Sequence, residues 1–178
     1  MRRASVVAAA RTVLGNDGVP GVTPAAVARG AGLARSSVYQ YYPSSAALLA
    51  AAVEAMFAEA AERIRDDLAR ADSPREQIRA YVRAAVTTAT DRCGPFHGLT
   101  GLVLPEPCRA RLRELHEQLA EPLRAAVAAS GAPAPEITSA LVLGAVASAA
   151  NLVQNGHDLD DALARTLDFV ENGLPGPG

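Results

Sequence analysis

Apolar residues recur three and four positions apart along most of this chain, which is the spacing of one face of an α-helix. No stretch shows the convincing alternation of a strand. We therefore predict an all-α protein of about nine helices. Glycine, proline and short polar residues interrupt the pattern and set the expected helix ends. The helices are expected at about residues 3–14, 24 to the glycines at 30 and 32, 35–42, 45–70, 74–91, a short stretch within 92–107, 108–130, 134–155, and from 159 onward.

The densest set of local signals lies in residues 22–49. Thr23 and Pro24 form an N-cap and first-turn pair, because the threonine hydroxyl accepts a free amide and proline gives up an N–H that has no partner. Gly30 and Gly32 can end this helix through a positive φ. Pro43 ends the next short helix, and another begins after it. This order predicts a helix-turn-helix, which places its second helix in the major groove of DNA.

The helix expected over residues 45–70 is unusually long. At about 1.5 Å per residue it measures roughly 40 Å, which is enough to join two domains. We predict a helix-turn-helix DNA-binding domain over residues 1–43 and an effector-binding and dimerisation domain over residues 44–178. Pro122 falls inside a later expected helix and should kink it.

Charge is distributed unevenly along the 178 residues, although the net charge is only −2. Residues 1–50 hold five arginines and one aspartate, a net of +4, whereas the remainder holds 12 arginines and 18 acids, a net of −6. A basic head on an acidic body favours a DNA-binding module joined to a domain with another task. The sequence contains no lysine, so every basic contact is made by arginine. No run of 18 uninterrupted apolar residues occurs, and we expect a cytoplasmic protein without a membrane partner.

Signals for catalysis and cofactors are weak. The chain has no phosphate-binding glycine loop, no Gly-x-Ser-x-Gly elbow and no close pair of carboxylates on its apolar faces, so we do not expect an enzyme. Cys93 lies four residues before His97, and Cys108 eight before His116, which leaves a zinc site or a thiol sensor open as alternatives. Without a Cys-x-x-Cys motif, we interpret both cysteines as buried thiols and predict no metal and no cofactor.

Several polar and aromatic residues of the second domain fall on faces that lean inward. An apolar pocket with a few polar groups is the usual site for a small effector, and we take these residues as candidates for it. The alternative for each is that it satisfies a neighbouring group. The candidates are Tyr81, Thr87, Thr88, Phe96, His97, Ser148, Asn151 and Gln154.

The last two expected helices each carry an apolar face, which is more than one small core needs. We predict that they form a symmetric four-helix interface between two copies of the chain. The alternative is that both faces are buried within one chain. The interface candidates are Leu141, Gly144, Ala145, Ser148, Leu152, Leu159, Leu163 and Leu167.

Residues 8–49 resemble the DNA-binding domain of the TetR family of transcriptional regulators, without gaps across three helices and into a fourth. The positions that carry the resemblance are Ala9-Ala10, Gly18, Thr23, Val27-Ala28, Ala31-Gly32-Leu33, Val38-Tyr39, Tyr42-Pro43-Ser44 and Leu48. The rest of the chain is similar to the family only in size, helical content and helix order.

The resemblance implies which residues contact DNA. The resemblance implies phosphate contacts from Thr23 at the start of the first helix of the motif and from Tyr39, which matches the family's tyrosine. Tyr41 stands where histidine is common and is implied to contact the backbone too. Residues in the first turn of the second helix are implied to read base edges and nearby phosphates, and Gln40 later in that helix can pair with adenine. The implied contacts are Thr23, Arg29, Arg35, Ser36, Ser37, Tyr39, Gln40, Tyr41 and Ser45.

Three features depart from the family. Ala34 opens the second helix where a capping serine is usual, Ser45 stands where lysine is common, and almost no basic arm precedes the first helix. The resemblance implies a homodimeric regulator that responds to a small-molecule effector of unknown identity, and we expect a repressor released from a palindromic double-stranded DNA operator by a small apolar effector. The alternatives are a helical small-molecule-binding protein or enzyme with a vestigial head, and an architectural DNA-binding protein without an effector.

Overall fold

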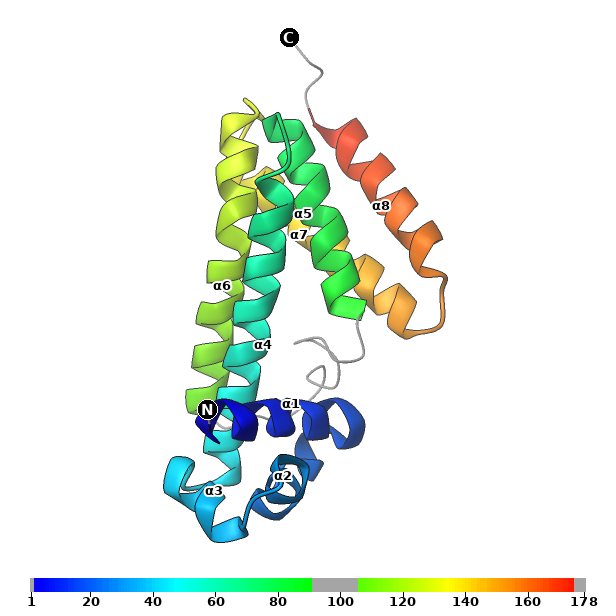
Figure 1. The fold of residues 1–178 in the computed structure, drawn as a ribbon. Helices are drawn as coiled ribbons and strands as arrows, with labels where there is room; N and C mark the ends of the chain where they lie inside the picture. The colour runs from blue at the N-terminus through cyan, green and yellow to red at the C-terminus, as the bar shows by residue number, and fades with distance from the viewer. Residues whose placement is uncertain (1, 91–105, 175–178) are drawn as a thin grey trace. The chain divides into compact units, whose positions relative to one another are not determined.

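A computed structural model describes residues 2–90 and 106–174 (Figure 1). This part of the chain forms eight α-helices and no strand, which confirms the predicted all-α class. The helices are α1 (Arg2–Gly21), α2 (Pro24–Ala31), α3 (Arg35–Tyr41), α4 (Ser45–Leu68), α5 (Pro74–Thr90), α6 (Glu106–Ala129), α7 (Pro135–Gln154) and α8 (Leu159–Gly173). The extra short helix expected within residues 92–107 falls almost wholly outside the described residues. Pro122 lies within α6, and its kink stays a prediction.

Two compact units divide the chain. The first comprises residues 1–59 and 91–115, and the second comprises residues 60–90 and 116–178. Helices α4 and α6 therefore contribute residues to both units. The domain boundary expected after residue 43 is not tested by this division and stays a prediction.

The end of α1 differs from the prediction. The helix was expected to end at residues 15–18, but helical structure continues to Gly21 through a kink at Gly18, where φ is +67°. Only glycine adopts this left-handed conformation at little cost, so the chain bends at one residue and then makes a further helical turn. The turn-forming residues 15–18 predicted a helix end, but in the structure they mark a bend within α1.

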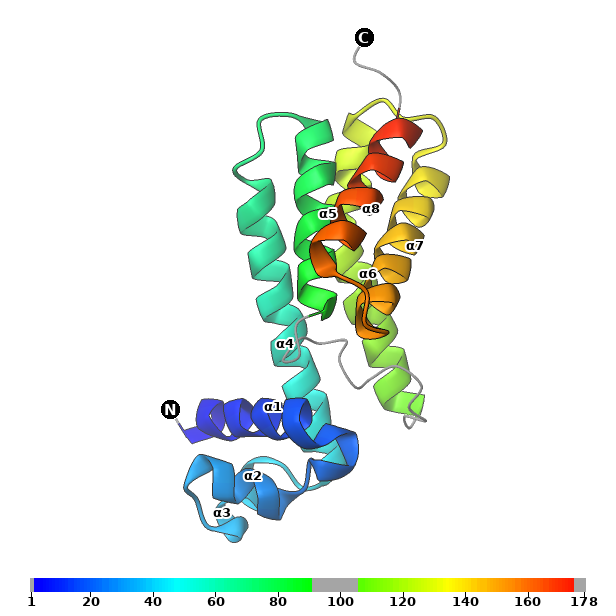
Figure 2. The same ribbon diagram turned by 90° about the vertical axis from the view of Figure 1, so that its right-hand side faces the viewer.

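The head, α1 to α3, is built on the local signals seen in the sequence (Figure 2). Thr23 caps α2 by accepting a hydrogen bond from the amide of Ala26 at 3.2 Å. Gly32 ends α2 with a φ of +65°, and the amide of Leu33 returns to the carbonyl of Ala28 at 2.9 Å. This pattern is the left-handed helix ending that glycine favours.

Gly30 has a different role from the one expected. It lies inside α2, and a Cβ built there would come within 3.3 Å of the Cβ of Ala9 in α1. The missing side chain thus allows α1 and α2 to approach closely. This contact joins positions 21 residues apart in the sequence, so no local pattern could distinguish it from a helix ending.

The apolar core of the head lies between α1, α2 and α3. Val6, Ala10, Val27 and Val38 are each fully buried or nearly so. Burial of these side chains supplies most of the driving force for a small helical unit. As expected, the helix after Pro43 is capped by Ser44, whose Oγ accepts the amide of Ala47 at 3.1 Å.

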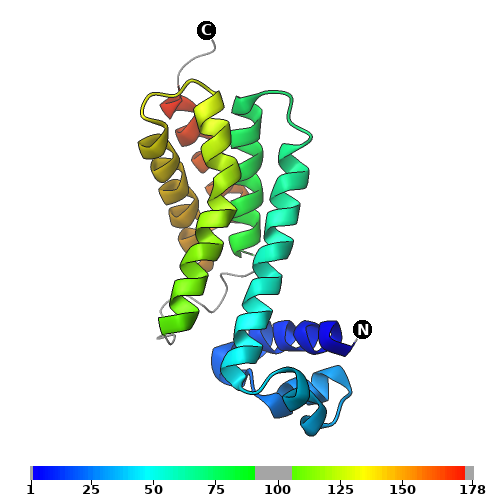
Figure 3. The same cartoon turned by 90° about the vertical axis from the view of Figure 1, so that its left-hand side faces the viewer.

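In the second unit, α5 packs against both α7 and α8, and α7 packs against α8 (Figures 2 and 3). One face of α5 is buried along most of its length, from Ile78 to Ala89. Leu123 and Val127 of α6 are fully buried. The core of this unit is therefore formed by aliphatic side chains from helices at helical spacing, as the sequence pattern predicted.

Helix α7 is strongly apolar yet poorly covered. Among the described helices it is the one that by itself has the length and composition to cross a membrane, with a mean hydropathy of 1.5, while α3 and α4 pass the same test only when joined across a 68° bend. Only 28% of the apolar window of α7 is buried. A single such helix is weak evidence for a span, and the exposed apolar surface of α7 needs its own explanation.

Candidate nucleic-acid interface and apolar groove

Helix α3 presents most of its predicted DNA contacts to solvent. Arg35, Ser36 and Gln40 are exposed, as are Tyr39 and Tyr41, whose exposed fractions are 41% and 36%. Ser37 is half-buried, and Val38 faces the core. Large aromatic side chains left exposed on a short helix are unusual unless they meet a partner.

The other predicted DNA contacts, Thr23, Arg29 and Ser45, are also exposed. The Thr23 hydroxyl accepts a bond from the α2 amide and still carries a proton that it can donate to a phosphate oxygen. The start of α2 can thus be capped and contact an anion at the same time.

Ala34 confirms the weak start of α3 expected from the sequence. Its backbone has the extended conformation of an N-cap, with φ −69° and ψ 145°, but its side chain offers no hydrogen bond to the helix. The cost of lacking a capping side chain at such a position is about 1 kcal/mol.

Two predicted contact residues meet each other on the surface of α3. The Nη2 group of Arg35 donates to the hydroxyl of Tyr39 at 3.1 Å, and the guanidinium carbon lies 5.5 Å from the centre of the tyrosine ring. The four-residue spacing places the two side chains one helical turn apart on the same face.

A second arginine–tyrosine pair was not predicted. Nε of Arg3, in the first turn of α1, donates to the hydroxyl of Tyr42 at 3.1 Å, and its guanidinium carbon lies 5.4 Å from the ring centre. The hydrogen bond to the phenol oxygen raises the pKa of Arg3, because it favours the charged guanidinium. Tyr42 is only 5% exposed, so this pair fixes the start of α1 to the end of α3 inside the head.

Ion pairs tie α4 to its neighbours in the first unit. Arg11 of α1 pairs with Glu59, and Nε of Arg111 in α6 bonds Glu54 at 2.8 Å. Arg111 also bonds Glu114 at 2.9 Å, and these two carboxylates raise its pKa. None of these long-range pairs carries a local sequence signal, since the two partners are 48 and 57 residues apart.

The described members of the predicted effector-pocket set differ in burial. Tyr81 and Thr88 of α5 are buried, with exposed fractions of 2% and 3%, whereas Thr87 is exposed on the same helix. Burial raises the pKa of Tyr81 to about 12, partly offset by the nearby Arg124 guanidinium. Phe96 and His97 lie outside the described residues.

The α7 members of that set are exposed. Gln154 uses its amide group to donate to the carbonyl of Ala89 at 3.3 Å, which joins the ends of α7 and α5. The carbonyl of Asn151 accepts from the side chain of Asn155 at 2.8 Å. Ser148 lines a groove on the outer side of α7. The effector site therefore stays a prediction.

An open apolar groove of about 580 Å³ runs along α7 and α8. It is lined by Ala140, Leu141, Gly144, Ala145, Ser148, Ala149, Leu152, His157, Asp161, Ala162, Arg165, Thr166 and Phe169. Five of the predicted interface residues, Leu141, Gly144, Ala145, Ser148 and Leu152, belong to this groove.

The predicted interface face of α8 needs correction. Leu163 and Leu167 are each 8% exposed, because they pack into the core of their own unit, and Leu159 is half-buried. The large apolar residue that α8 exposes is Phe169, at 66%. Sequence periodicity identified the leucine face correctly as apolar but could not tell that α5 and α7 cover it.

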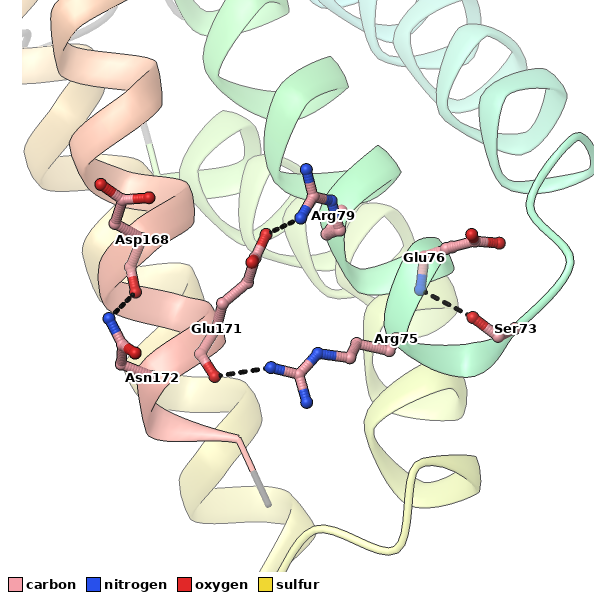
Figure 4. Close-up of polar contacts among 7 residues, drawn as sticks. All are labelled: Ser73, Arg75, Glu76, Arg79, Asp168, Glu171 and Asn172. Carbon is pink, nitrogen blue, oxygen red and sulfur yellow. Dashed lines mark hydrogen bonds and ion pairs between the residues drawn. The ribbon is translucent and has the colours of Figure 1, made fainter. Parts of the chain in front are cut away.

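The C-terminal end of α8 is held to the start of α5 by two arginines (Figure 4). Arg75 donates to the main-chain carbonyl of Glu171 at 3.0 Å, and Arg79 pairs with the carboxylate of the same residue. The carbonyl belongs to the last turn of α8, where it also accepts the amide of Leu174 at 3.4 Å and where a positive charge is favourable. These contacts help to fix α8, and with it one wall of the groove.

Metal-binding potential is low in the described part of the chain. Across residues 2–90 and 106–174, no three histidine, cysteine, aspartate or glutamate side chains cluster as a metal ion requires. Cys93, His97 and the side chain of Cys108 lie outside that part, so the zinc and thiol-sensor alternatives are not tested by this observation.

The head matches a known family. Residues 6–52 match the model of the bacterial regulatory proteins of the tetR family. This range begins within α1, includes the whole helix-turn-helix and ends within α4. The chain matches no curated protein in sequence.

Solved structures share the fold over nearly the full length of the chain. A putative TetR-family transcriptional regulator from Rhodococcus sp. is 17% identical with a TM-score of 0.84, covering 98% of this chain and 99% of its own. A putative transcriptional regulator from Saccharomonospora viridis in complex with choline is 15% identical with a TM-score of 0.82, covering 97% and 96%. The fatty acid degradation regulator FadR from Bacillus halodurans is 15% identical with a TM-score of 0.81, covering 99% and 97%.

At such identities these structures establish the fold. The helix-turn-helix with its exposed arginine and tyrosines lies within the segment that matches the family model. The head of this chain is therefore similar to the bacterial regulatory proteins of the tetR family, and the chain shares its all-helical fold with solved regulators of that kind.

Proposed function

We propose that the protein is a homodimeric repressor that binds a palindromic operator through α3 and releases it when a small effector binds the second unit. The observation that carries this proposal is the solvent-exposed face of α3, where an arginine, a glutamine and two tyrosines stand free of the core. Phosphate contacts from the tyrosines would set the position of the head, and base contacts would supply sequence preference.

The apolar groove of α7 and α8 supports the proposed dimer. Of its lining residues, Leu141 is 64% exposed, Leu152 is 47% exposed and Phe169 is 66% exposed. Side chains of this kind on adjacent helices are stable in water mainly when a partner covers them. A second copy of the same face would form a four-helix interface with two-fold symmetry, which matches the symmetry of a palindromic operator.

Two heads related by that two-fold would reach successive major grooves, with half-site centres about one helical turn apart or slightly more. The effector would act by preferring a state of the dimer whose heads have the wrong spacing. A hundredfold loss of DNA affinity requires a difference of about 2.7 kcal/mol between the effector's binding free energies for the two states.

The effector is proposed to be a small molecule, mostly apolar, bound among the helices of the second unit. The structure of the Saccharomonospora viridis regulator in complex with choline supports a ligand of small size for this fold. We further propose that the protein works in the cytoplasm, where its operator lies, and that it catalyses no reaction.

Selection of bound sequences from random DNA by the purified full-length chain tests the DNA-binding part of the proposal. We expect a palindromic site with two equal half-sites, and a gel shift with that site at a stoichiometry of two chains per duplex. Failure to enrich any sequence would overturn the proposal and favour a vestigial head. Enrichment of a single half-site bound by one chain would overturn the dimer.

A thermal-shift screen with small molecules tests the effector. We expect at least one compound that raises the melting temperature and weakens operator binding in proportion to its concentration, because the two effects are thermodynamically linked. A compound that stabilises the protein while leaving operator affinity unchanged would contradict a regulatory role for its site.

A further inference from the structure

Arg35 and Tyr39 form a contact on the surface of α3 that burial does not force. Both side chains are exposed, yet the hydrogen bond from Nη2 to the hydroxyl at 3.1 Å and the 5.5 Å approach to the ring hold the guanidinium in one place. A free surface arginine loses much rotamer entropy when it is ordered. A guanidinium already held before DNA arrives loses less on binding.

Arg35 and Tyr39 keep further hydrogen-bond donors in addition to this contact. The Tyr39 oxygen accepts the bond from Arg35, and its own proton stays available for a phosphate oxygen. Arg35 has five N–H groups, so a parallel pair of donors stays available on the guanidinium. Phosphate, tyrosine, arginine and a base edge can therefore be joined in one chain of hydrogen bonds.

We propose that Arg35 reads a guanine in the major groove and that Tyr39 is a positioning residue that aims it. This inference rests on the proposed DNA-binding function. Guanine fits because its O6 and N7 present two adjacent acceptors to the guanidinium fork, whereas adenine places a donor beside N7. A bidentate pair between arginine and guanine is also the commonest specific contact in protein–DNA complexes.

The Arg3–Tyr42 pair in the same head shows what distinguishes this arrangement. It has nearly the same geometry, with a 3.1 Å hydrogen bond and a 5.4 Å ring approach. Tyr42, however, is 5% exposed while Tyr39 is 41% exposed. The first pair stabilises the head, and the second presents its polar groups where a duplex would lie.

The test uses the full-length chain and the operator obtained by selection. Each guanine of one half-site is replaced in turn by 7-deazaguanine, which keeps base pairing and removes only the N7 acceptor, and binding is followed by fluorescence anisotropy. For the wild type we expect one guanine whose replacement weakens binding about tenfold or more. In R35A that penalty should disappear, and R35K, which keeps the charge without the fork, should lose most of it.

Tyr39→Phe separates positioning from phosphate binding. It should lower affinity for all sequences and also reduce the penalty at the Arg35-dependent guanine. Tyr41→Phe is the matched control, because it removes a hydroxyl from the same helix and leaves the Arg35–Tyr39 contact intact; it should lower affinity equally for all sites and keep the full penalty. Melting curves for each variant check that the head is folded.

The outcomes separate the two levels of the argument. An operator whose guanines all tolerate 7-deazaguanine, or whose sensitive guanine behaves alike in the wild type and R35A, would overturn the guanine contact and leave the proposed function standing. A full penalty retained in Tyr39→Phe would overturn the positioning role alone. The absence of any selected operator would refute the proposed function itself.

Discussion

Replacing Leu141 by alanine should weaken the dimer without weakening the fold of the single chain. Full burial of a leucine side chain is worth about 1.5–3 kcal/mol. Leu141 is 64% exposed, so covering this exposed part would contribute about 1–2 kcal/mol per chain, and about 2–4 kcal/mol in a symmetric dimer where the contact occurs twice. The dissociation constant of the dimer should therefore rise about 30-fold to 1,000-fold.

Leu163→Ala is the matched control, since it makes the same chemical change on the neighbouring helix. Leu163 is 8% exposed and packs within its own unit. Its truncation should cost about 2–5 kcal/mol in the free energy of unfolding and have a much smaller effect on dimer dissociation. Chemical denaturation at fixed concentration measures the free energy of unfolding, and sedimentation equilibrium over a dilution series measures the dissociation constant of the dimer.

A dissociation constant for Leu141→Ala within threefold of the wild type would show that Leu141 is not part of the dimer interface. An equal rise in that constant for Leu163→Ala and Leu141→Ala would contradict an interface at the groove of α7 and α8, because the inner leucine face of α8 would then be the interface. A wild-type chain that stays monomeric at all concentrations would leave the groove of α7 and α8 to another partner and would contradict the proposed dimer.

Three further predictions concern single residues. Gly32→Ala should lower the free energy of unfolding by about 1–2 kcal/mol in a denaturant titration, because φ is +65° there while the space around the new Cβ is open. Gly32→Asn should lower it less, because asparagine tolerates a positive φ better than alanine does. Equal losses for the two variants would contradict backbone strain as the cause. Ala34→Ser should raise the stability of the head by about 1 kcal/mol, seen as slower hydrogen exchange in α3, unless the serine fails to accept an amide of the first turn. The pKa of Tyr81 is raised from 10.0 to about 12, so the unfolded chain releases this proton first as pH rises. The contribution of Tyr81 to the free energy of unfolding should therefore be fully present below about pH 10 and be lost between about pH 10 and 12. Tyr81→Phe should remove this component, and identical alkaline profiles would show that Tyr81 is not the group responsible.

Local chemistry explains which parts of the fold the sequence could predict. Thr23, Pro43 and Ser44 set helix ends through hydrogen bonds and steric limits that involve only a few neighbouring residues, and each was correctly assigned. Gly32 likewise ends α2 by a conformation that is readable from the residue type. Gly30 could not be assigned in this way, since its role depends on Ala9 of another helix.

The candidate sites show the same difference between local signals and contacts that join distant parts of the chain. Periodicity showed that α8 has an apolar face, but whether Leu163 and Leu167 meet their own chain or a partner depends on how α5 and α7 pack. Phe169 was missed because no large apolar residue stands three or four positions from it, so it belongs to no apolar face at helical spacing. The Arg3–Tyr42 contact was missed because it joins residues 39 positions apart.

The two arginine contacts at the end of α8 differ in how they tolerate mutation. The bond from Arg75 is made to the main-chain carbonyl of residue 171, which every amino acid provides. The pairing with Arg79 depends on the carboxylate that glutamate supplies. A substitution at position 171 can therefore remove the contact with Arg79 while the contact with Arg75 stays, so α8 keeps one of these two attachments to α5.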